Sequence, residues 1–211
     1  MMKRPLLIAT HNQGKLEEFR RILGLPAIDL VSLSDLCIDT EVEEQGETFN
    51  EIAAAKARAY ALISRHTTLA DDSGLVIDAL DGRPGIFSAR YAGESGNDLD
   101  RIDKVLRELR NVEAGERTAR FVCALSLSDS YGEIVSTVTG ACEGEIIFEP
   151  RGENGFGYDP IFQPGGFMQT FAELDSSTKD RISHRALAAA KIIPFLQGFF
   201  DIRLDRLRIR L

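Results

Sequence analysis

The sequence lacks the features of three classes of protein. It has no apolar run long enough to cross a membrane, and the run after Arg4 is too short for a signal peptide, so we expect a cytoplasmic protein with no membrane partner. Its cysteines are few, odd in number and without the spacing of a metal site, which favours reduced thiols. It has no excess of basic residues, because its 25 Lys and Arg are outnumbered by 33 Asp and Glu. The net charge of −8 argues against a surface that binds nucleic-acid polymers. The three cysteines are Cys37, Cys123 and Cys142.

Repeats, low-complexity tracts and linkers are also absent, so nothing divides the 211 residues into separate domains. We therefore expect a single domain over residues 1–211, with one sizeable core or two lobes that share a sheet. Because the net charge is negative, the positive charge that holds an anionic ligand must be gathered locally. The candidates for this role are Lys15, Lys56, Lys179 and Arg185.

The hydrophobic periodicity predicts an α/β chain. Thr48 and Glu51 form a capping box, which opens a helix to about Ile63, and a second helix is expected over residues 98–109. Helix-rich and hairpin-rich stretches are separated along the chain, which indicates a mixed sheet rather than a uniform βα repeat. The apolar stripe of the second helix is expected to consist of Leu99, Ile102, Leu106 and Leu109. The expected strands are residues 6–9, 68–70, 75–80, 119–127, 133–139 and 143–148.

A short segment after the first strand has the composition of a phosphate-binding turn. Apolar residues recur at helical spacing after it, so it leads into the start of a helix. Backbone N–H groups at a helix start have no intrahelical partner and carry the positive end of the helix dipole, which makes the site attractive to anions. The alternative is an ordinary strand-to-helix turn with a solvated lysine. The segment is Thr10-His11-Asn12-Gln13-Gly14-Lys15.

Two adjacent carboxylates, Asp71 and Asp72, are expected at the junction between two strands. Adjacent carboxylates repel one another and are costly to bury, and a Mg²⁺ ion beside a phosphate would relieve that repulsion. The alternative is a turn in which one aspartate caps backbone amides. The acidic run at residues 41–44 could supply a further metal ligand, although by itself it is typical of a solvated face.

Two later segments could recognise a base. The loop 155–160 (Gly-Phe-Gly-Tyr-Asp-Pro) combines aromatic rings with glycines, so a ring could stack on a flat base while an acid or a backbone group contacts its edge. His184 and Arg185 place two donors side by side, which suits a carbonyl acceptor on a base. The alternatives are a tight turn with buried aromatic residues and a solvated histidine near a helix start.

Five motifs occur along the chain in one order. They are Thr10-x-Asn12-x-x-Lys15, Ala70-Asp71-Asp72-Ser73-Gly74-Leu75, Pro84-Gly85-Ile86-Phe87-Ser88-Ala89-Arg90-Tyr91, Gly155-Phe156-Gly157-Tyr158-Asp159-Pro160-Ile161-Phe162 and Ile182-Ser183-His184-Arg185. Together they resemble the inosine triphosphate pyrophosphatase family, whose bacterial members are called dITP/XTP pyrophosphatases, and the resemblance covers roughly residues 6–198.

The resemblance implies an elongated mixed β-sheet flanked by helices, with two lobes and a central active-site cleft. It also implies a homodimer that uses Mg²⁺ to hydrolyse deaminated purine nucleoside triphosphates (ITP, dITP, XTP) to the monophosphate and pyrophosphate, which cleanses the nucleotide pool.

The resemblance assigns roles to individual residues. Water attacks the α-phosphorus, and Asp72 is our choice of general base and metal ligand. Glu43 is the second metal ligand by resemblance, with Glu44 as the neighbouring alternative. The phosphates are assigned to Thr10, His11, Asn12, Gln13, Gly14, Lys15 and Lys179, with Ser73 nearby. The base pocket is assigned to Phe156, Gly157, Tyr158, Asp159, His184 and Arg185.

Two rival functions remain at this stage. One is a related nucleotide pyrophosphatase or phosphatase with another base preference. The other is a nucleotide-binding regulatory module without catalysis, against which the presence of both Asp72 and Lys15 argues. The tail from Phe199 to Leu211 lies outside the resemblance, and its alternating Arg and apolar residues fit an added edge strand, a dimer contact or a partly ordered end.

Overall fold

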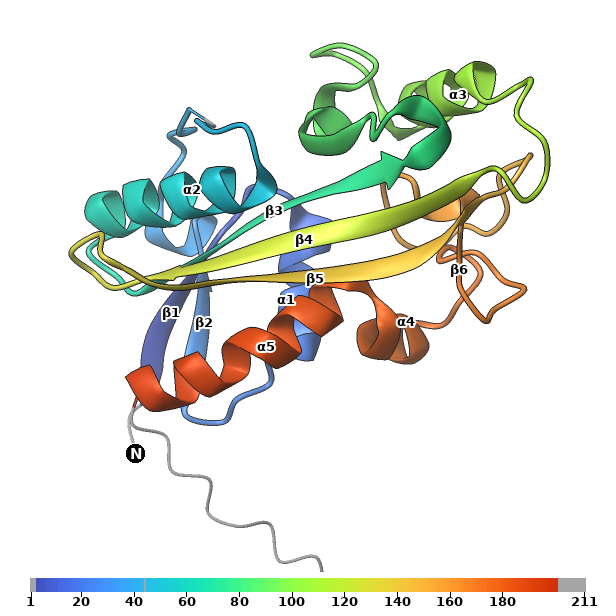
Figure 1. The fold of residues 1–211 in the computed structure, drawn as a ribbon. Helices are drawn as coiled ribbons and strands as arrows, with labels where there is room; N and C mark the ends of the chain where they lie inside the picture. Colours follow the sequence, from blue (N-terminus) through green and yellow to red (C-terminus); the bar gives the residue numbers. More distant parts are fainter. Residues whose placement is uncertain (1–2, 44, 201–211) are drawn as a thin grey trace, which may run out of the picture.

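The structure is a computed structural model that describes residues 3–43 and 45–200. Its centre is one six-stranded sheet with the strand order β2-β1-β3-β4-β5-β6 (Figure 1). β1 (Arg4–Ala9) pairs in parallel with β2 (Ile28–Ser32) and with β3 (Thr68–Ile77). From β3 through β4 (Thr118–Ser128) and β5 (Ile134–Ile146) to β6 (Phe162–Pro164), each strand is antiparallel to the next. The predicted mixed sheet is therefore confirmed.

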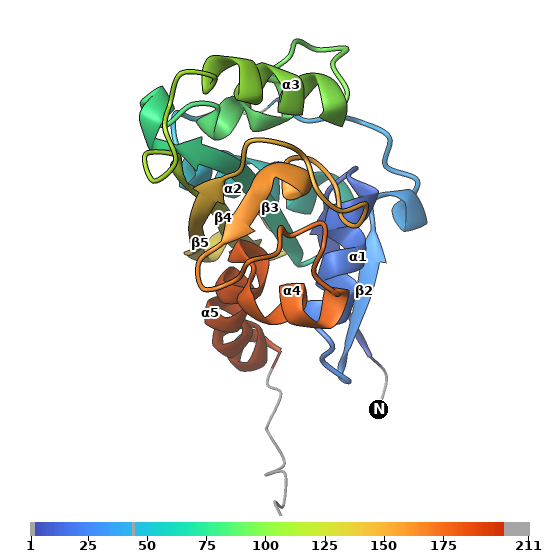
Figure 2. The same cartoon turned by 90° about the vertical axis from the view of Figure 1, so that its right-hand side faces the viewer.

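Helices cover both faces of this sheet. α2 (Phe49–Ser64) packs on one face, whereas α1 (Gln13–Ile22) and α5 (His184–Phe199) pack with strands on the other (Figures 1 and 2). α3 (Asp98–Glu108) lies over the far end of the long strands, where a further apolar cluster contains residues of β4, β5 and β6. α4 (Ser176–Ile182) directly precedes α5. β3, β4 and β5 thus run between two packed regions, as the expected elongated sheet requires.

The helix starts follow from local sequence. Asn12, Thr48 and Asn97 each precede a helix and accept a hydrogen bond from a backbone N–H of its first turn. The predicted capping box of Thr48 and Glu51 is present, and a second one joins Asn97 to Asp100. The expected apolar stripe of α3 is wrong at Leu99, which is 69% exposed, because the buried side of the helix is formed by Ile102, Val105 and Leu109 instead.

Two pairs of expected strands are single strands in the structure. Asp71 and Asp72 do not lie at a junction, since β3 runs through them and every one of its residues pairs with β4. Likewise the expected strands 133–139 and 143–148 are one strand, β5, which pairs with β4 along nearly its whole length. The sequence does not show that each strand is continuous, because polar residues and glycines interrupt the apolar pattern. In the structure a long partner strand supplies the hydrogen bonds that keep the backbone extended.

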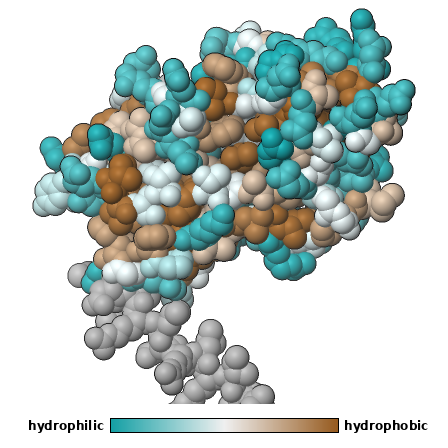
Figure 3. Space-filling view, viewed as in Figure 1, coloured by the Kyte–Doolittle hydropathy of each residue, from teal (hydrophilic) through white to brown (hydrophobic). Residues whose placement is uncertain are grey.

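Within the described residues, no helix is both long and apolar enough to cross a bilayer. On the face drawn in Figure 3, apolar residues form separate patches among hydrophilic ones. The expectations for the tail, including Leu207, Ile209 and Leu211, and for Glu44 fall outside the described residues.

Candidate active site

The predicted phosphate turn lies between the end of β1 and the first turn of α1. Asn12 Oδ1 accepts the Lys15 N–H at 3.0 Å, and Thr10 Oγ1 accepts the Asn12 N–H at 3.1 Å. These bonds fix the turn, and the side chains of His11, Asn12 and Gln13 remain exposed. The start of α1 is thus accessible to a ligand, with its unpaired amides and the positive end of the helix dipole.

The two neighbouring aspartates point to opposite faces of the sheet, as successive residues of a strand must. Asp71 faces α1 and α5: it pairs with Lys15, accepts the Ser73 hydroxyl at 2.7 Å and contacts Arg185 Nε at 3.2 Å. Burial favours a raised pKa for Asp71, but the charges of Lys15 and Arg185 prevail and hold that pKa well below its ordinary value. Asp71 is therefore an ionised partner of the two cations.

Asp72 faces the other side of the sheet, the side covered by α2. Ala70 lies two residues before Asp72, on the same face of β3, and packs with residues of α2. Gly74 lies two residues after Asp72, and a Cβ at this position would clash with the Gly85 carbonyl and the Ser88 hydroxyl. A cavity of about 530 Å³ opens beside α2 and is lined by Glu43, Lys56 and, from the phosphate turn, Thr10, His11, Asn12 and Lys15. β3 thus directs Asp72 toward the layer of the molecule that contains this cavity.

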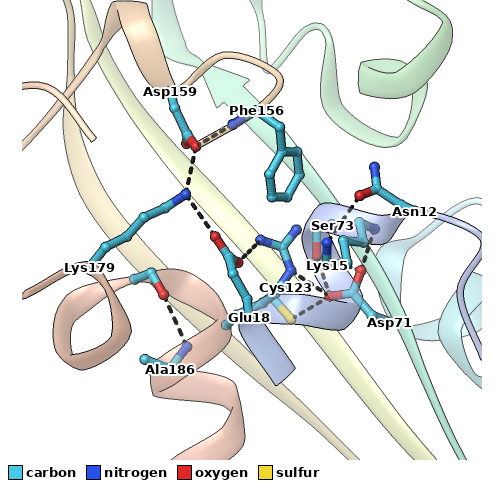
Figure 4. A network of polar contacts seen from close by, with 12 residues as sticks. Asn12, Lys15, Glu18, Asp71, Ser73, Cys123, Phe156, Asp159, Lys179 and Ala186 are labelled. Atoms are coloured by element: carbon cyan, nitrogen blue, oxygen red, sulfur yellow. Dashed lines mark hydrogen bonds and ion pairs between the residues drawn. The ribbon is translucent and has the colours of Figure 1, made fainter. Parts of the chain in front are cut away.

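Buried charged side chains form one continuous network of ion pairs. Glu18 Oε2 accepts from Arg185 Nη1 at 2.7 Å, and its other oxygen contacts Lys179 Nζ at 2.7 Å. Lys179 Nζ also donates to Asp159 Oδ2 at 2.6 Å (Figure 4). Together with the pairing of Asp71, acids and bases alternate from Lys15 to Asp159, so each buried charge is compensated.

The acids at the two sides of Lys179 are held differently. Burial favours a raised pKa for Glu18, but Arg185 and Lys179 together outweigh it and lower that pKa below its ordinary value. Burial prevails at Asp159 and raises its pKa although Lys179 opposes the change. Glu18 is thus the firmly ionised member that holds both cations in place.

A second cavity of about 110 Å³ has the character of a base pocket. It is lined by Phe121, Phe156, His184 and Arg185, and it shares Asn12, Lys15 and Ala89 with the larger cavity. The two cavities therefore adjoin at the phosphate turn. The Phe156 ring lies against α1, since a Cβ on Gly14 would come within 2.5 Å of it. Lys179 Nζ and the Arg185 guanidinium each lie 5.3 Å from the centroid of the same ring, within the range of a cation–π contact.

His184 has an unusual environment in this pocket. It is the first residue of α5 and stacks on Phe121, with the ring centroids 4.7 Å apart and the planes 12° from parallel. Neither ring nitrogen has a hydrogen-bond partner among the described residues, although the side chain is buried. Burial, followed by the charge of Arg185, lowers the pKa of His184 well below its ordinary value, so the imidazole is neutral. Buried polar atoms are normally paired, and this exception points to a ligand that supplies the partner.

Comparison with known proteins matches this arrangement to one family: the family model described as Ham1 family covers residues 6–195. The chain belongs to the Ham1 family. A protein named dITP/XTP pyrophosphatase from Bacillus subtilis is 51% identical to it over 192 residues, which are 91% of this chain and 96% of that protein. A protein of the same name from Halalkalibacterium halodurans is 48% identical over 190 residues, 90% of this chain and 97% of the relative. The structure of a HAM1 protein from Coxiella burnetii superimposes with a TM-score of 0.83 at 40% identity, covering 92% of this chain and 99% of that one.

The match confirms the family and the fold expected from the five motifs. Within this Ham1 fold, most of the predicted site residues converge on the two adjoining cavities. Glu43 and four residues of the phosphate turn (Thr10, His11, Asn12 and Lys15) line the larger cavity, and the aromatic loop, His184 and Arg185 line the smaller one. Gln13, Gly14, Asp72 and Lys179 line neither of the two. Ser73 lines the smaller cavity as well, where it donates to Asp71.

Lys179 does not lie where a phosphate ligand was expected. The residue is 5% exposed, and its ammonium is held between Glu18 and Asp159, next to the ring of Phe156. This position favours support of the base pocket over a direct phosphate contact, because a phosphate would have to displace two carboxylates from the ammonium.

Three residues of the site were not predicted from the sequence. Glu18 lies one turn after Lys15 on α1, and the sequence does not distinguish it from the neighbouring Glu17, which is exposed in the structure. Phe121 belongs to the alternating apolar pattern of a strand, and this pattern does not mark it as a residue of the site. Asp98, at the start of α3, reaches the aromatic loop from the other side of the pocket, and its sequence neighbours suggest only a helix cap.

Proposed function

We propose that this protein hydrolyses deaminated purine nucleoside triphosphates, namely ITP, dITP and XTP, to the nucleoside monophosphate and pyrophosphate. The observation that carries the proposal is the junction of two cavities at Asn12 and Lys15, with a helix start on one side and a base-sized aromatic pocket on the other. The identity to proteins named dITP/XTP pyrophosphatase over nine-tenths of the chain supports the same substrates.

The triphosphate would lie along the larger cavity. The amides at the start of α1 and the Lys15 ammonium would bind phosphate oxygens, with Thr10 and Asn12 as the neighbouring polar side chains. Because Lys15 is paired with Asp71, it is held in place before substrate arrives, and its position needs little ordering on binding.

The donor set of the site fits Mg²⁺. Within the residues that the structure describes, no group of three or more His, Cys, Asp and Glu side chains could hold an ion. Mg²⁺ needs no such cage, since it is usually bound by one or two carboxylates, several waters and substrate phosphates. Asp72 and Glu43 would provide the carboxylates, and the bound ion would neutralise charge on the phosphate oxygens.

The chain would activate water through Asp72. A carboxylate at this position can hold a water molecule and accept its proton as the water attacks the α-phosphorus. Pyrophosphate is then the leaving group. Glu43 would assist only by holding the ion, because it is exposed on a loop and is hydrogen-bonded to Gln45 at 3.0 Å.

The base would be selected by hydrogen bonding at position 6 of the purine. A neutral His184 can turn its N–H toward the carbonyl of inosine or xanthosine, and the adjacent Arg185 has donors and no acceptor. The amino group of adenosine would meet these donors with another donor, which leaves buried polar atoms unpaired at a cost of about 1–3 kcal/mol. GTP shares the 6-carbonyl, so its rejection must arise at its 2-amino group.

Arg185 and Lys179 would contribute to the base pocket in a second way. Both lie close to the Phe156 ring, and both are held by Glu18. They would therefore fix the ring on which the purine stacks, in addition to any contact of Arg185 with the base. We also propose a cytoplasmic homodimer, on the family resemblance; light scattering at several protein concentrations measures the assembly.

Product analysis in ¹⁸O-labelled water tests this function. With ITP and Mg²⁺, we expect IMP that contains the label and unlabelled pyrophosphate, with no release of orthophosphate. EDTA should stop the reaction, and restored Mg²⁺ should recover it. Label in pyrophosphate or release of orthophosphate would indicate another cleavage site. Binding of ITP without any product would instead support a regulatory module.

A further inference from the structure

The loop 155–159 determines the shape of the base pocket. It carries Phe156, whose ring forms one wall, but the backbone on either side of this residue is glycine in a positive-φ conformation, at +78° for Gly155 and +64° for Gly157. Glycines leave many other backbone conformations open. Hydrogen bonds to the loop backbone must therefore hold the ring in the position that stacks on a base.

Two carboxylates hold the backbone of the loop, one from within it and one from α3. Asp159 accepts the Phe156 N–H at 2.9 Å and is tied to Lys179 on α4. Asp98, on α3, accepts the Gly157 N–H at 2.7 Å. The amides of Phe156 and of the next residue are thus each bound by a carboxylate, and Asp98 links the loop to α3.

Asp98 is itself held rigidly. Its second oxygen forms an ion pair with Arg101, and Arg101 donates to the carbonyl oxygens of Ala89 and Gly96. Ala89 lines both cavities of the site. The position of the loop is therefore coupled to the wall of the pocket opposite α1.

The cap of α3 does not depend on Asp98. Asn97 and Asp100 make the reciprocal hydrogen bonds of the capping box. The Asp98 side chain is 43% exposed, so its removal opens no cavity in the core. An effect of substituting Asp98 would hence report on the loop and not on the folding of the helix.

We propose that Asp98 is a positioning residue, which holds the Gly157 amide and thereby sets the affinity of the pocket for the base. Asp98 lines the smaller cavity, but both of its oxygens are engaged by protein donors, Gly157 N–H and Arg101, so its effect on the base is exerted through the loop. This inference rests on the proposed hydrolysis of ITP for its kinetic readout. Loss of the anchor weakens binding before and during reaction alike, which raises KM and leaves kcat nearly unchanged.

The test compares three variants with the unmutated protein. Asp98→Ala removes the acceptor, and Asp98→Asn keeps an acceptor oxygen for Gly157 while losing the charge. Asp103→Ala is the matched control, since it removes the same charge from an exposed position of the same helix. We expect KM for ITP to rise about tenfold in Asp98→Ala, the usual effect of losing a hydrogen bond to a charged group, and less than about threefold in the other two. Hydrogen exchange of the segment 155–159 should accelerate only in Asp98→Ala.

The two readouts separate this inference from the proposed function. If the unmutated protein does not hydrolyse ITP, the function is wrong, and hydrogen exchange alone still decides whether Asp98 holds the loop. If exchange is the same in Asp98→Ala and Asp103→Ala, the anchor does not exist. An unchanged KM despite faster exchange, or a fall in kcat at constant KM, would overturn the positioning role.

Discussion

Replacing His184 by phenylalanine should weaken ITP hydrolysis without weakening the fold. The imidazole is 2% exposed and stacks on Phe121, while its nitrogens bond to no described residue. A phenyl ring retains the stack and removes both nitrogens, so the folded protein loses no internal hydrogen bond. Burying unpaired polar atoms is unfavourable, and the unfolding midpoint of His184→Phe should therefore be unchanged or higher.

The size of the kinetic effect follows from the unpaired carbonyl that the substitution leaves. A buried acceptor without a donor costs about 1–3 kcal/mol, which corresponds to roughly a 5- to 150-fold loss of kcat/KM for ITP. ATP presents an amino group at the same position and gains nothing from the histidine N–H, so its kcat/KM should change little. The ratio of ITP to ATP hydrolysis should fall by the same factor.

The assay is steady-state hydrolysis of ITP and ATP, with thermal unfolding measured on the same samples. His66→Phe serves as the control, because His66 lines neither cavity of the site and its Nδ1 bonds to the Ser64 carbonyl oxygen. Equal losses for ITP and ATP would mean that His184 does not read the base. An unchanged rate with ITP in a folded His184→Phe protein would remove the residue from recognition.

Four further predictions concern the acids, the phosphate turn and pH. Asp72→Asn should lower turnover by about 10²–10⁴-fold in a folded protein, the usual effect of losing a general base, and near-normal turnover would exclude Asp72 from the mechanism. Lys15→Ala should raise KM for ITP and also lower stability, because Asp71 loses one of its two cations; if KM and turnover are unchanged, the turn is structural. Glu18→Gln should destabilise the protein by about 3–5 kcal/mol in urea unfolding, since two buried cations lose their shared acid, and a loss below about 1 kcal/mol would contradict the buried network. His184 is protonated near pH 6.5 in the unfolded chain but stays neutral in the folded chain. The free energy of unfolding should therefore fall as the pH drops below 6.5, by up to about 1.4 kcal/mol per pH unit. The slope should be shallower in His184→Phe, and identical slopes would refute the neutral buried imidazole.

Local sequence signals were sufficient for part of the fold and for many of the residues that line the two cavities. The capping box of Thr48 and Glu51 predicts its helix because capping depends on neighbours within one turn. The five motifs identify the family because each contains residues that only a particular backbone or a particular chemistry requires. The same motifs contain most of the residues that line the smaller cavity, whereas most of those that line the larger one, such as Glu41, Glu43 and Lys56, lie outside them.

What the sequence did not reveal depends on contacts between distant segments. β3 continues through Asp71 and Asp72 because β4 pairs with it throughout and because Lys15 and Arg185 compensate the buried Asp71. Lys179 and Glu18 lie on different helices, and only the tertiary fold shows that the lysine is bound by two acids. Single-sequence periodicity cannot show such compensation, since it measures apolar spacing and not the partners of charged groups.

Competition between ITP and ATP in one reaction tests the central claim most directly. Equal concentrations of both nucleotides compete for the same site with Mg²⁺ present, so the initial ratio of IMP to AMP gives the ratio of their kcat/KM values. The pocket formed by Phe156, His184 and Arg185 predicts that IMP and pyrophosphate accumulate while ATP remains. Formation of IMP and AMP at equal rates would contradict recognition of the 6-carbonyl and would favour a pyrophosphatase with a broader choice of base.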